Sequence, residues 1–274
     1  MPPDRSTGNE TERHTTAPAE SRVSRDERRH ATPNAFGALD ARRSALDSEV
    51  AAGLAADLAA IRAMNFGFLV FPGLEELDLV GPWEMVSIWS RALQGPERCL
   101  LVAQSLAPVV CAKGLSLNPH ADFAGCPPLD ALLVPGGQGT RTEVDNEVLV
   151  RFVADQARHA QAVLSVCTGS FILHRAGLLA GKRATTHWSS LARLRALGGV
   201  EVVEERIVRD GGIWTSAGVS AGIDLALAFI EATAGETVAG KVQFGAEYYP
   251  SGRRYGDFHQ SPPAPAYLRR PPPG

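Results

Sequence analysis

The sequence has 274 residues, of which 45% are hydrophobic and 21% charged, which is the composition of an ordinary globular protein. A formal net charge of −3 gives no reason to expect a nucleic acid as partner. No apolar run approaches the ~20 residues that span a bilayer, and the N-terminus lacks the apolar stretch of a signal peptide. The composition therefore gives no reason to expect a membrane or nucleic-acid partner.

The four cysteines do not form a recognisable metal or disulfide pattern. They contain no C-x-x-C pair, and no histidine lies nearby at the spacing of a zinc site. The sequence also has no glycine-rich phosphate loop, so no metal or organic cofactor is expected. Free cysteines suit a reducing compartment, which predicts a cytoplasmic protein. The four are Cys99, Cys111, Cys126 and Cys167.

The N-terminal part is expected to lie outside the folded domain. Residues 1–45 are rich in charged residues, Thr and Pro and poor in large apolar residues, which predicts a disordered arm. In residues 46–63, Leu and Val recur every three or four positions, which predicts an amphipathic helix. Met64 directly precedes the first apolar strand, so translation starting there is one interpretation. A regulatory arm is another, whereas the acidic residues argue against a transit segment.

Residues 64–250 alternate between predicted strands and helices. Nearly continuous apolar runs predict buried strands, and a weakly alternating stretch at 106–119 is compatible with a short hairpin. The alternation predicts a mostly parallel sheet with helices on both faces. From Ser251 the chain is rich in Pro, Arg and Gly and is expected to form a tail. The predicted strands are residues 65–71, 98–103, 130–134, 162–166, 200–204 and 206–215, and the predicted helices are 82–89, 144–153, 170–176, 218–230 and 236–249.

Two segments that follow predicted strands contain candidate site residues. Asp78 lies at a strand-to-helix crossing, where α/β folds collect ligand groups, although a solvated carboxylate or a helix cap is the alternative interpretation. Gly136 and Gly137 end the strand at 130–134. Glycines there can direct an N–H group into a site or form only a turn.

The strongest candidate is Cys167. It stands where the apolar strand 162–166 ends, and Thr168, Gly169 and Ser170 lead into a predicted helix. Such a turn is a nucleophile elbow, in which the helix N-terminus favours the thiolate over the thiol. An ordinary buried cysteine that packs as a small hydrophobe is the alternative.

His187 lies in a predicted short strand or turn at residues 183–188. It could approach the nucleophile as a base or hydrogen-bond partner. A histidine beside a tryptophan, here Trp188, is also commonly packed and satisfied, so both roles stay open.

Three segments together resemble the ThiJ/PfpI superfamily, and the resemblance runs from about residue 66 to 249. It implies a flavodoxin-like α/β sandwich related to the class I glutamine amidotransferases. Within the superfamily, residues 77–82 together with Cys167 and Thr168 most resemble the isocyanide hydratases, although Val80 stands where those have threonine. The three segments are residues 166–170, 184–188 and 221–224.

The resemblance implies that the chain hydrates isocyanides to N-substituted formamides, with no cofactor. Cys167 would be the nucleophile that forms a cysteine-bound thioimidate, and Asp78 the acid–base carboxyl. Thr168 would position and tune the thiol, and the N–H groups of Gly137 and Thr168 would form an anion pocket. A pocket of low dielectric constant and a neighbouring thiolate would raise the pKa of Asp78.

Two other classes of function stay open. A redox-sensing or stress-protection protein, similar to glyoxalases and deglycases of the superfamily, would also use an exposed thiolate. The ligand-binding domains of AraC-type regulators resemble the chain too, but the Pro-rich tail leaves no room for a helix-turn-helix domain. A homodimer is expected, partly because Trp83 and Trp89 exceed what one helix face needs to bury internally.

Overall fold

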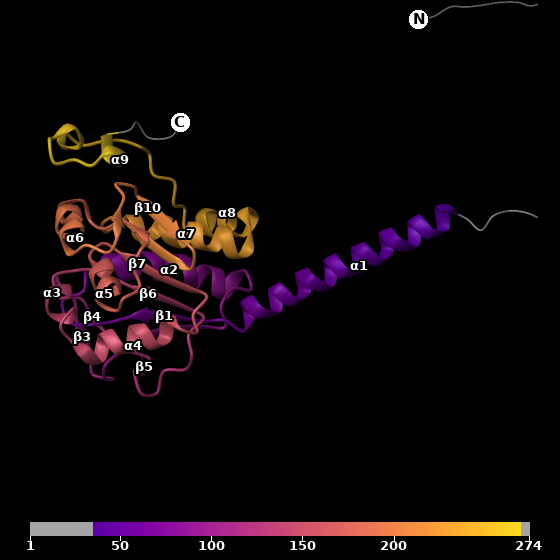
Figure 1. Ribbon diagram of the computed structural model, residues 1–274, viewed down its shortest axis with the longest axis horizontal. Coiled ribbons are helices and arrows are strands. Elements are labelled where there is room, and N and C mark those ends of the chain that lie inside the picture. Colours follow the sequence, from indigo (N-terminus) through magenta and orange to yellow (C-terminus); the bar gives the residue numbers. More distant parts are fainter. Residues whose placement is uncertain (1–34, 270–274) are drawn as a thin grey trace, which may run out of the picture. The chain divides into compact units, whose positions relative to one another are not determined.

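The computed structural model describes residues 35–269, and the chain divides into two units, residues 1–51 and 52–274. Helix α1 (Ala35–Arg62) begins within the arm that was expected to be disordered, and the rest of that arm lies outside the described residues (Figure 1). The helix is confirmed over residues 46–62, but its leucines at 46, 54 and 58 are exposed, whereas Ile61 is buried. No described helix has the length and apolar character needed to cross a membrane.

The second unit is built on one seven-stranded sheet, in the order β10-β11-β7-β6-β1-β2-β5. Every neighbouring pair is parallel except β10 and β11, which form an antiparallel hairpin within the segment predicted as a strand at 206–215. The central strands are nearly all apolar because helices cover both of their faces. The strands are β1 (Asn65–Leu69), β2 (Arg98–Ala103), β5 (Ala121–Asp122), β6 (Ala131–Val134), β7 (Ala162–Val166), β10 (Ile207–Asp210) and β11 (Ile213–Ser216).

Two small sheets accompany the large one. Strands β3 (Val109–Val110) and β4 (Ser116–Leu117) form the short antiparallel hairpin expected in this region. Strands β8 (Arg183–Ala184) and β9 (Glu201–Val202) pair in parallel. Strand β9 is shorter than the predicted strand at 200–204.

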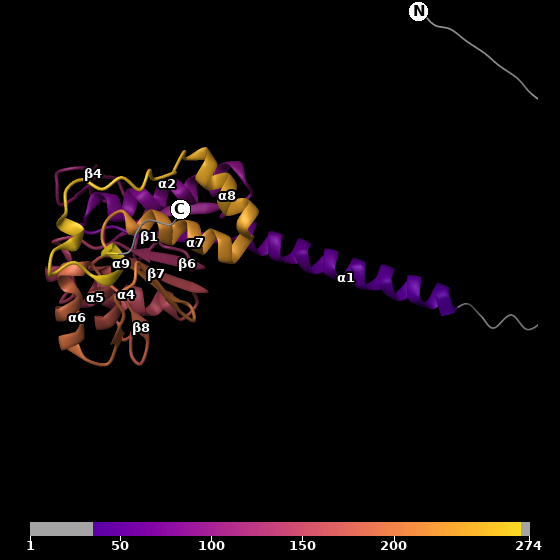
Figure 2. The same cartoon turned by 90° about the horizontal axis from the view of Figure 1, so that it is seen from above.

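The large sheet has helices on both faces, as the sequence predicts. Helices α2, α7 and α8 pack against one another on one face, and α4 and α5 lie together on the other (Figure 2). Helix α6 was not predicted, because Leu191 and Leu194 are too few to show a helical period. The helices of the two faces are α2 (Glu76–Ala92), α7 (Ala221–Ala234), α8 (Glu236–Gly245), α4 (Glu147–Ala157) and α5 (Gly169–Arg175), and the shorter ones are α3 (Thr140–Glu143) and α6 (Leu191–Leu197).

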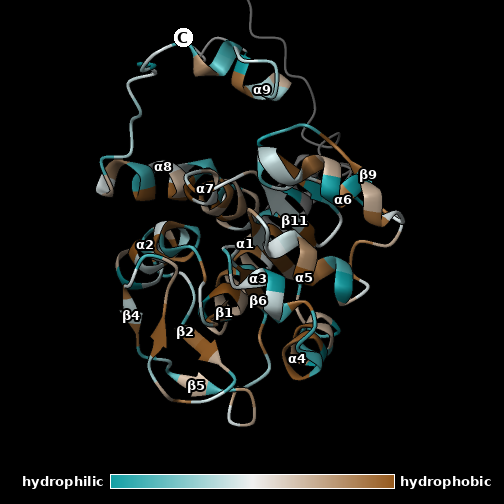
Figure 3. Cartoon of the chain, turned by 90° about the vertical axis from the view of Figure 1, so that its left-hand side faces the viewer, coloured by the Kyte–Doolittle hydropathy of each residue, from teal (hydrophilic) through white to brown (hydrophobic). Residues whose placement is uncertain are grey.

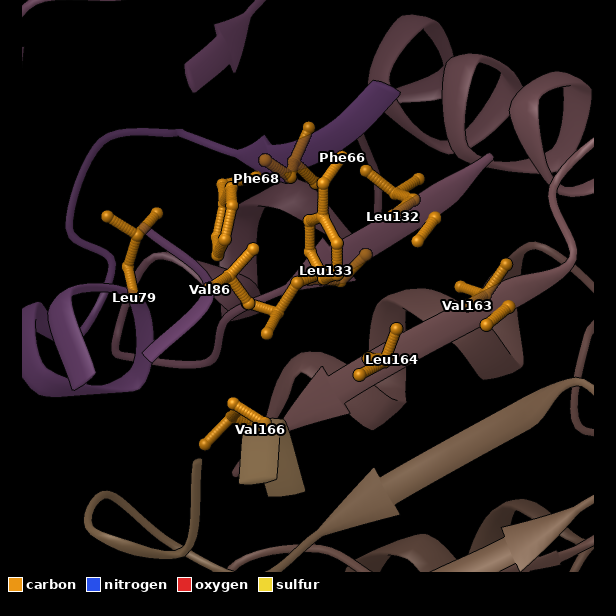
Figure 4. Packing of buried hydrophobic residues seen from close by; sticks show 14 of the residues in the cluster. Phe66, Phe68, Leu79, Val86, Leu132, Leu133, Val163, Leu164 and Val166 are labelled. Atoms are coloured by element: carbon orange, nitrogen blue, oxygen red, sulfur yellow. The ribbon is translucent and has the colours of Figure 1, made fainter. Parts of the chain in front are cut away.

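The core lies between the sheet and these helices. Figure 4 shows aromatic and aliphatic side chains of β1, β6 and β7 beside Leu79 and Val86 of α2. Trp89 is fully buried against Phe229, and Trp83 packs edge-on against Phe68. The expectation that both tryptophans exceed what the monomer buries is therefore wrong for Trp89.

The C-terminal segment is more ordered than a tail. It contains a 3₁₀ turn, η2 (Phe258–Gln260), and a short helix, α9 (Ala266–Arg269). Ala264 and Pro265 between them are buried. The brown strands in Figure 3 mark the apolar sheet, and this segment passes outside it.

Candidate active site

Three predicted site segments meet at the carboxyl ends of adjacent strands. The loop after β1 leads to Asp78 in the first turn of α2, the loop after β6 contains Gly136 and Gly137, and β7 ends at Cys167. These strands are neighbours in the order β7-β6-β1. Parallel strands end at the same edge of a sheet, so segments distant in sequence form one site.

The backbone at Cys167 forms a nucleophile elbow, as predicted. Its φ of 57° is left-handed, which is unfavourable for any residue other than glycine. The Cys167 N–H donates to the carbonyls of Ser216 (3.2 Å) and Ala217 (3.1 Å), and its carbonyl accepts from Thr186 Oγ1 (2.9 Å). Gly169 lets the turn approach β6, because a Cβ there would lie 2.2 Å from the Val134 carbonyl oxygen. These contacts hold the strained turn in place.

The Cys167 thiol is buried, with 7% of the residue exposed. Burial and the nearby Asp78 carboxylate raise its pKa to about 12, although the Thr168 N–H and hydroxyl and the Val219 N–H act in the opposite direction. The Thr168 N–H at the start of α5 acts in the direction expected of a helix N-terminus, but burial and the Asp78 carboxylate act more strongly in the opposite direction.

Asp78 is completely buried. Its Oδ2 accepts a hydrogen bond from the Gly136 N–H (2.9 Å), but among the described residues its Oδ1 has no hydrogen-bond partner. Burial raises the pKa of Asp78 to about 7 and the charge of Glu75 adds to the rise, while the Gly136 N–H and the Cys167 thiol lower it. Burial raises this pKa as the sequence analysis expects, but the second expected cause, a neighbouring thiolate, is not seen, because the Cys167 thiol acts in the opposite direction. A carboxyl with this pKa can gain or lose a proton near neutrality.

The two glycines after β6 hold the site together in different ways. A Cβ on Gly136 would lie 2.8 Å from Asp78 Oδ2 and 2.7 Å from Thr168 Oγ1, so no side chain fits there. The Gly137 N–H donates to Thr168 Oγ1 (3.0 Å), and the Thr140 hydroxyl also lies 3.1 Å from that oxygen. The Gly137 N–H, which the resemblance assigns to an anion pocket, thus binds Thr168, whereas the Gly136 N–H binds the Asp78 carboxyl.

Charged residues form the rim of the site, and the sequence did not predict their contacts. Lys113, in the β3–β4 turn, pairs with Glu75 and lies 3.7 Å from Glu76 Oε2. Glu75 acts electrostatically on both Asp78 and His187. Lys113 and Glu75 are far apart in sequence, so no local pattern could have joined them.

His187 also lies at the rim. Its Nδ1 is 2.8 Å from Ser189 Oγ, and burial lowers its pKa while Glu75 opposes the change. The imidazole packs against Gly218, where a Cβ would lie 2.1 Å from the ring. Its hydrogen bond to Ser189 favours the packing interpretation. Over residues 35–269, no group of His, Cys, Asp and Glu could hold a metal ion, and the four cysteines are free.

Comparisons with known proteins agree with this geometry. Residues 65–232 match the DJ-1/PfpI family. The isonitrile hydratase of Pseudomonas putida is 42% identical over 189 residues, which are 69% of this chain and 80% of that protein. The HTH-type transcriptional regulator CdhR of Pseudomonas aeruginosa is 30% identical over 66% of this chain, but only 54% of the regulator is covered.

The fold also matches solved structures. The crystal structure of a ThiJ/PfpI family protein from Pseudomonas syringae has 37% sequence identity and a TM-score of 0.67. The match covers 76% of this chain and 85% of that chain. The predicted α/β sandwich is thereby confirmed.

Proposed function

The chain belongs to the DJ-1/PfpI family, and from this premise we propose that it hydrates isocyanides, also called isonitriles, to N-substituted formamides. The observation that carries the proposal is a fully buried Asp78 carboxyl beside the Cys167 thiol, with one oxygen that accepts no hydrogen bond from the part of the chain that the structure describes. Acid–base catalysis needs a carboxyl that is free to exchange a proton at neutral pH. The isonitrile hydratase of Pseudomonas putida supports the choice of substrate class.

The first step adds the thiol across the isocyanide carbon. At pH values above the pKa of Asp78, the Asp78 carboxyl and the Cys167 thiol together hold one proton. They do not lose both, because two adjacent negative charges in a buried site are unfavourable. When that proton is on Asp78, the sulfur is a thiolate. The carboxyl gives its proton to the isocyanide carbon while the sulfur forms a bond to the same carbon, which leaves a thioimidate, R–N=CH–S–Cys167.

The second step releases the product. The ionised Asp78 takes a proton from water, whose oxygen adds to the thioimidate carbon. Asp78 then gives this proton to the nitrogen. The carbon–sulfur bond breaks while the hydroxyl proton passes to the sulfur, which gives R–NH–CHO and restores the Cys167 thiol. The Thr168 and Val219 N–H groups that point at the sulfur stabilise it when it carries negative charge.

The direct test is to incubate the purified chain with alkyl and aryl isocyanides and to measure formamide by mass spectrometry. We expect formamide from the native chain and from Cys126→Ser, a matched control at a half-buried cysteine away from the elbow. Cys167→Ser should form none. Turnover of methylglyoxal but of no isocyanide would instead identify a glyoxalase-like member of the family.

We propose that residues 64–250 form the catalytic domain. Deletion of residues 1–63 should preserve activity, because the site is built entirely from later residues. Ile61 is buried, so the measurement that matters is the melting temperature of the shortened chain. A drop of many degrees would mean that the end of α1 is part of the domain.

We further propose a homodimer in the cytoplasm. Leu77 and Val80 of α2 are exposed, as is Phe244 of the adjacent α8, and together they supply apolar surface for a second copy. The free cysteines suit a reducing compartment. Light scattering at micromolar concentration tests the dimer, and a monomeric mass would contradict it.

A further inference from the structure

We propose that a cavity at the carboxyl ends of β1 and β2 binds a small organic ammonium ion, with the Glu143 carboxylate as its counter-charge. The ligand is an amine that is protonated at neutral pH and carries a compact apolar group. The cavity is lined by neither Asp78 nor Cys167, so the inference does not depend on the isocyanide chemistry proposed above.

The cavity has a volume of about 450 Å³ and lies where two neighbouring strands end. Val70 follows β1 directly, and its N–H donates to the Val102 carbonyl of β2 (2.8 Å), so the two strand ends stay side by side. Ligands of open α/β sheets bind at this edge of the sheet. Cavities of about 300–1,000 Å³ are the usual size of small-molecule sites.

The buried part of the cavity lining is apolar except for one carboxylate. Glu143, the last residue of α3, is only 8% exposed and is the one ionisable residue among the described residues that line the cavity. An apolar surface with a single converging charge is typical of a site for a small charged molecule. The buried apolar residues of the lining are Val70, Phe71, Ala103, Val109 and Leu149.

Asn146 fixes the Glu143 carboxylate. It is the N-cap of α4, where its Oδ1 accepts from the Leu149 N–H (3.2 Å). Its amide NH₂ group donates to Glu143 Oε2 (2.7 Å) and to Gln104 Oε1 (2.9 Å). Over residues 35–269, the other carboxylate oxygen, Glu143 Oε1, accepts no hydrogen bond. The carboxylate is therefore held in place with one oxygen that can accept from a ligand.

The Glu143 carboxylate also lacks a positively charged partner. None of the ion pairs in the described part of the chain includes it. A buried carboxylate without a counter-ion is unfavourable, and the N-terminus of α4 supplies only a partial positive charge. A protonated amine supplies the missing charge through a charge-assisted hydrogen bond and buries its apolar group against the lining.

A metal ion fits this cavity less well than an amine. Calcium and magnesium need about six or more oxygen ligands. Among the described residues, no group of His, Cys, Asp and Glu could hold a metal ion. One carboxylate in an apolar cavity therefore favours an organic cation.

The experiment measures the affinity for cyclohexylammonium and for the neutral cyclohexanol by isothermal titration calorimetry. Glu143→Gln removes the charge and keeps the length of the side chain. Glu147→Gln is the matched control, because Glu147 is exposed in the first turn of α4 and does not line the cavity. Ala107→Trp places a large ring at an exposed position of the lining and leaves Glu143 unchanged. Glu75→Gln tests whether the amine binds in the catalytic pocket instead.

The native chain, Glu147→Gln and Glu75→Gln should bind cyclohexylammonium with equal affinity, and cyclohexanol about tenfold or more weakly. Glu143→Gln should weaken cyclohexylammonium binding by about 10- to 100-fold, which is the scale of a hydrogen bond to a charged group. Ala107→Trp should weaken the binding of both compounds.

The proposal is overturned if the native chain binds no cyclohexylammonium at millimolar concentration. It is also overturned if Glu143→Gln binds the amine as tightly as the native chain while circular dichroism shows both to be folded. If Glu143→Gln does not fold, unchanged binding to Ala107→Trp rejects the cavity. A loss of affinity in Glu75→Gln but not in Glu143→Gln would place the amine in the catalytic pocket and reject it as well.

Discussion

The buried part of the site, formed by Asp78 and Cys167 and here called the floor, differs from the rim, formed by Glu75, Lys113 and His187, in whether its polar groups have partners. On the floor, Asp78 is fully buried with one oxygen unpaired, and Cys167 is held in a left-handed backbone conformation. At the rim, Glu75, Lys113 and His187 are partly exposed, and each has a charged or hydrogen-bonded partner. Buried groups without partners are unfavourable for folding and persist where they serve a reaction, whereas the rim pairs tune the floor from a distance.

The largest effect is expected at Cys167. Cys167→Ala should abolish isocyanide hydration, a loss of about 10⁴-fold or more, because no other described group stands in position to form the covalent bond. The fold should survive, since alanine is smaller than cysteine. Steady-state kinetics with a thermal melt as control checks both. Retained activity would show that the floor does not carry the reaction.

The next effect is expected at Asp78. Asp78→Asn should lose ~10²-fold or more in kcat, since an amide cannot exchange the proton that the two steps share. Asp78→Glu should retain more activity, with a loss caused by the displaced carboxyl. If Asp78→Asn hydrates isocyanides at the native rate, the proton comes from another group and the mechanism is wrong.

Variants of Glu75 and Lys113 test whether charges at the rim change the pKa of Asp78. The reactive state holds one proton on the Asp78–Cys167 pair, so kcat/KM should rise with pH through the pKa of Asp78, near 7. Glu75→Gln removes a negative charge that raises this pKa, and the rise should move to lower pH. Lys113→Ala removes a charge that lowers the pKa and should move it the other way. If neither variant shifts the pH profile, the charges of Glu75 and Lys113 do not affect the pKa of Asp78.

The smallest effect is expected at His187. Its ring bonds to Ser189 and packs on Gly218, so His187→Ala should reduce kcat only a few-fold. A general acid or base would lose ~10²-fold or more. Kinetics of His187→Ala beside Asp78→Asn makes the comparison directly. A loss as large as that of Asp78→Asn would show that His187 takes part in the reaction as an acid or base.

The sequence predicted those parts of the molecule that local patterns determine. Apolar runs located β1, β2, β6 and β7, and alternation with helices gave the sheet and its covered faces. The elbow at Cys167 was also predictable, because a strand, a small-residue turn and a helix are contiguous in the chain.

The remaining features depend on contacts between distant segments. The pairing of Lys113 with Glu75 and the bond from Gly136 to Asp78 join residues that are far apart in sequence. Part of what raises the pKa of Cys167, the charge of Asp78, comes from a segment far from the elbow in sequence. The two glycines at 136 and 137 were a signal, but only the folded backbone shows which of them serves the carboxyl.

The burial of Asp78 also has a consequence for stability. Its pKa is about 7 in the folded state against 3.8 for an ordinary aspartate, so the folded chain binds this proton more tightly than the unfolded chain. The free energy of unfolding should therefore fall as pH rises from about 4 to 7, by at most about 4 kcal/mol from this residue. Asp78→Asn lacks this loss and should unfold at a higher denaturant concentration than the native chain at pH 8, but not at pH 4. The difference in the free energy of unfolding between Asp78→Asn and the native chain at pH 8 would then measure how much stability the native chain loses by burying this ionisable carboxyl.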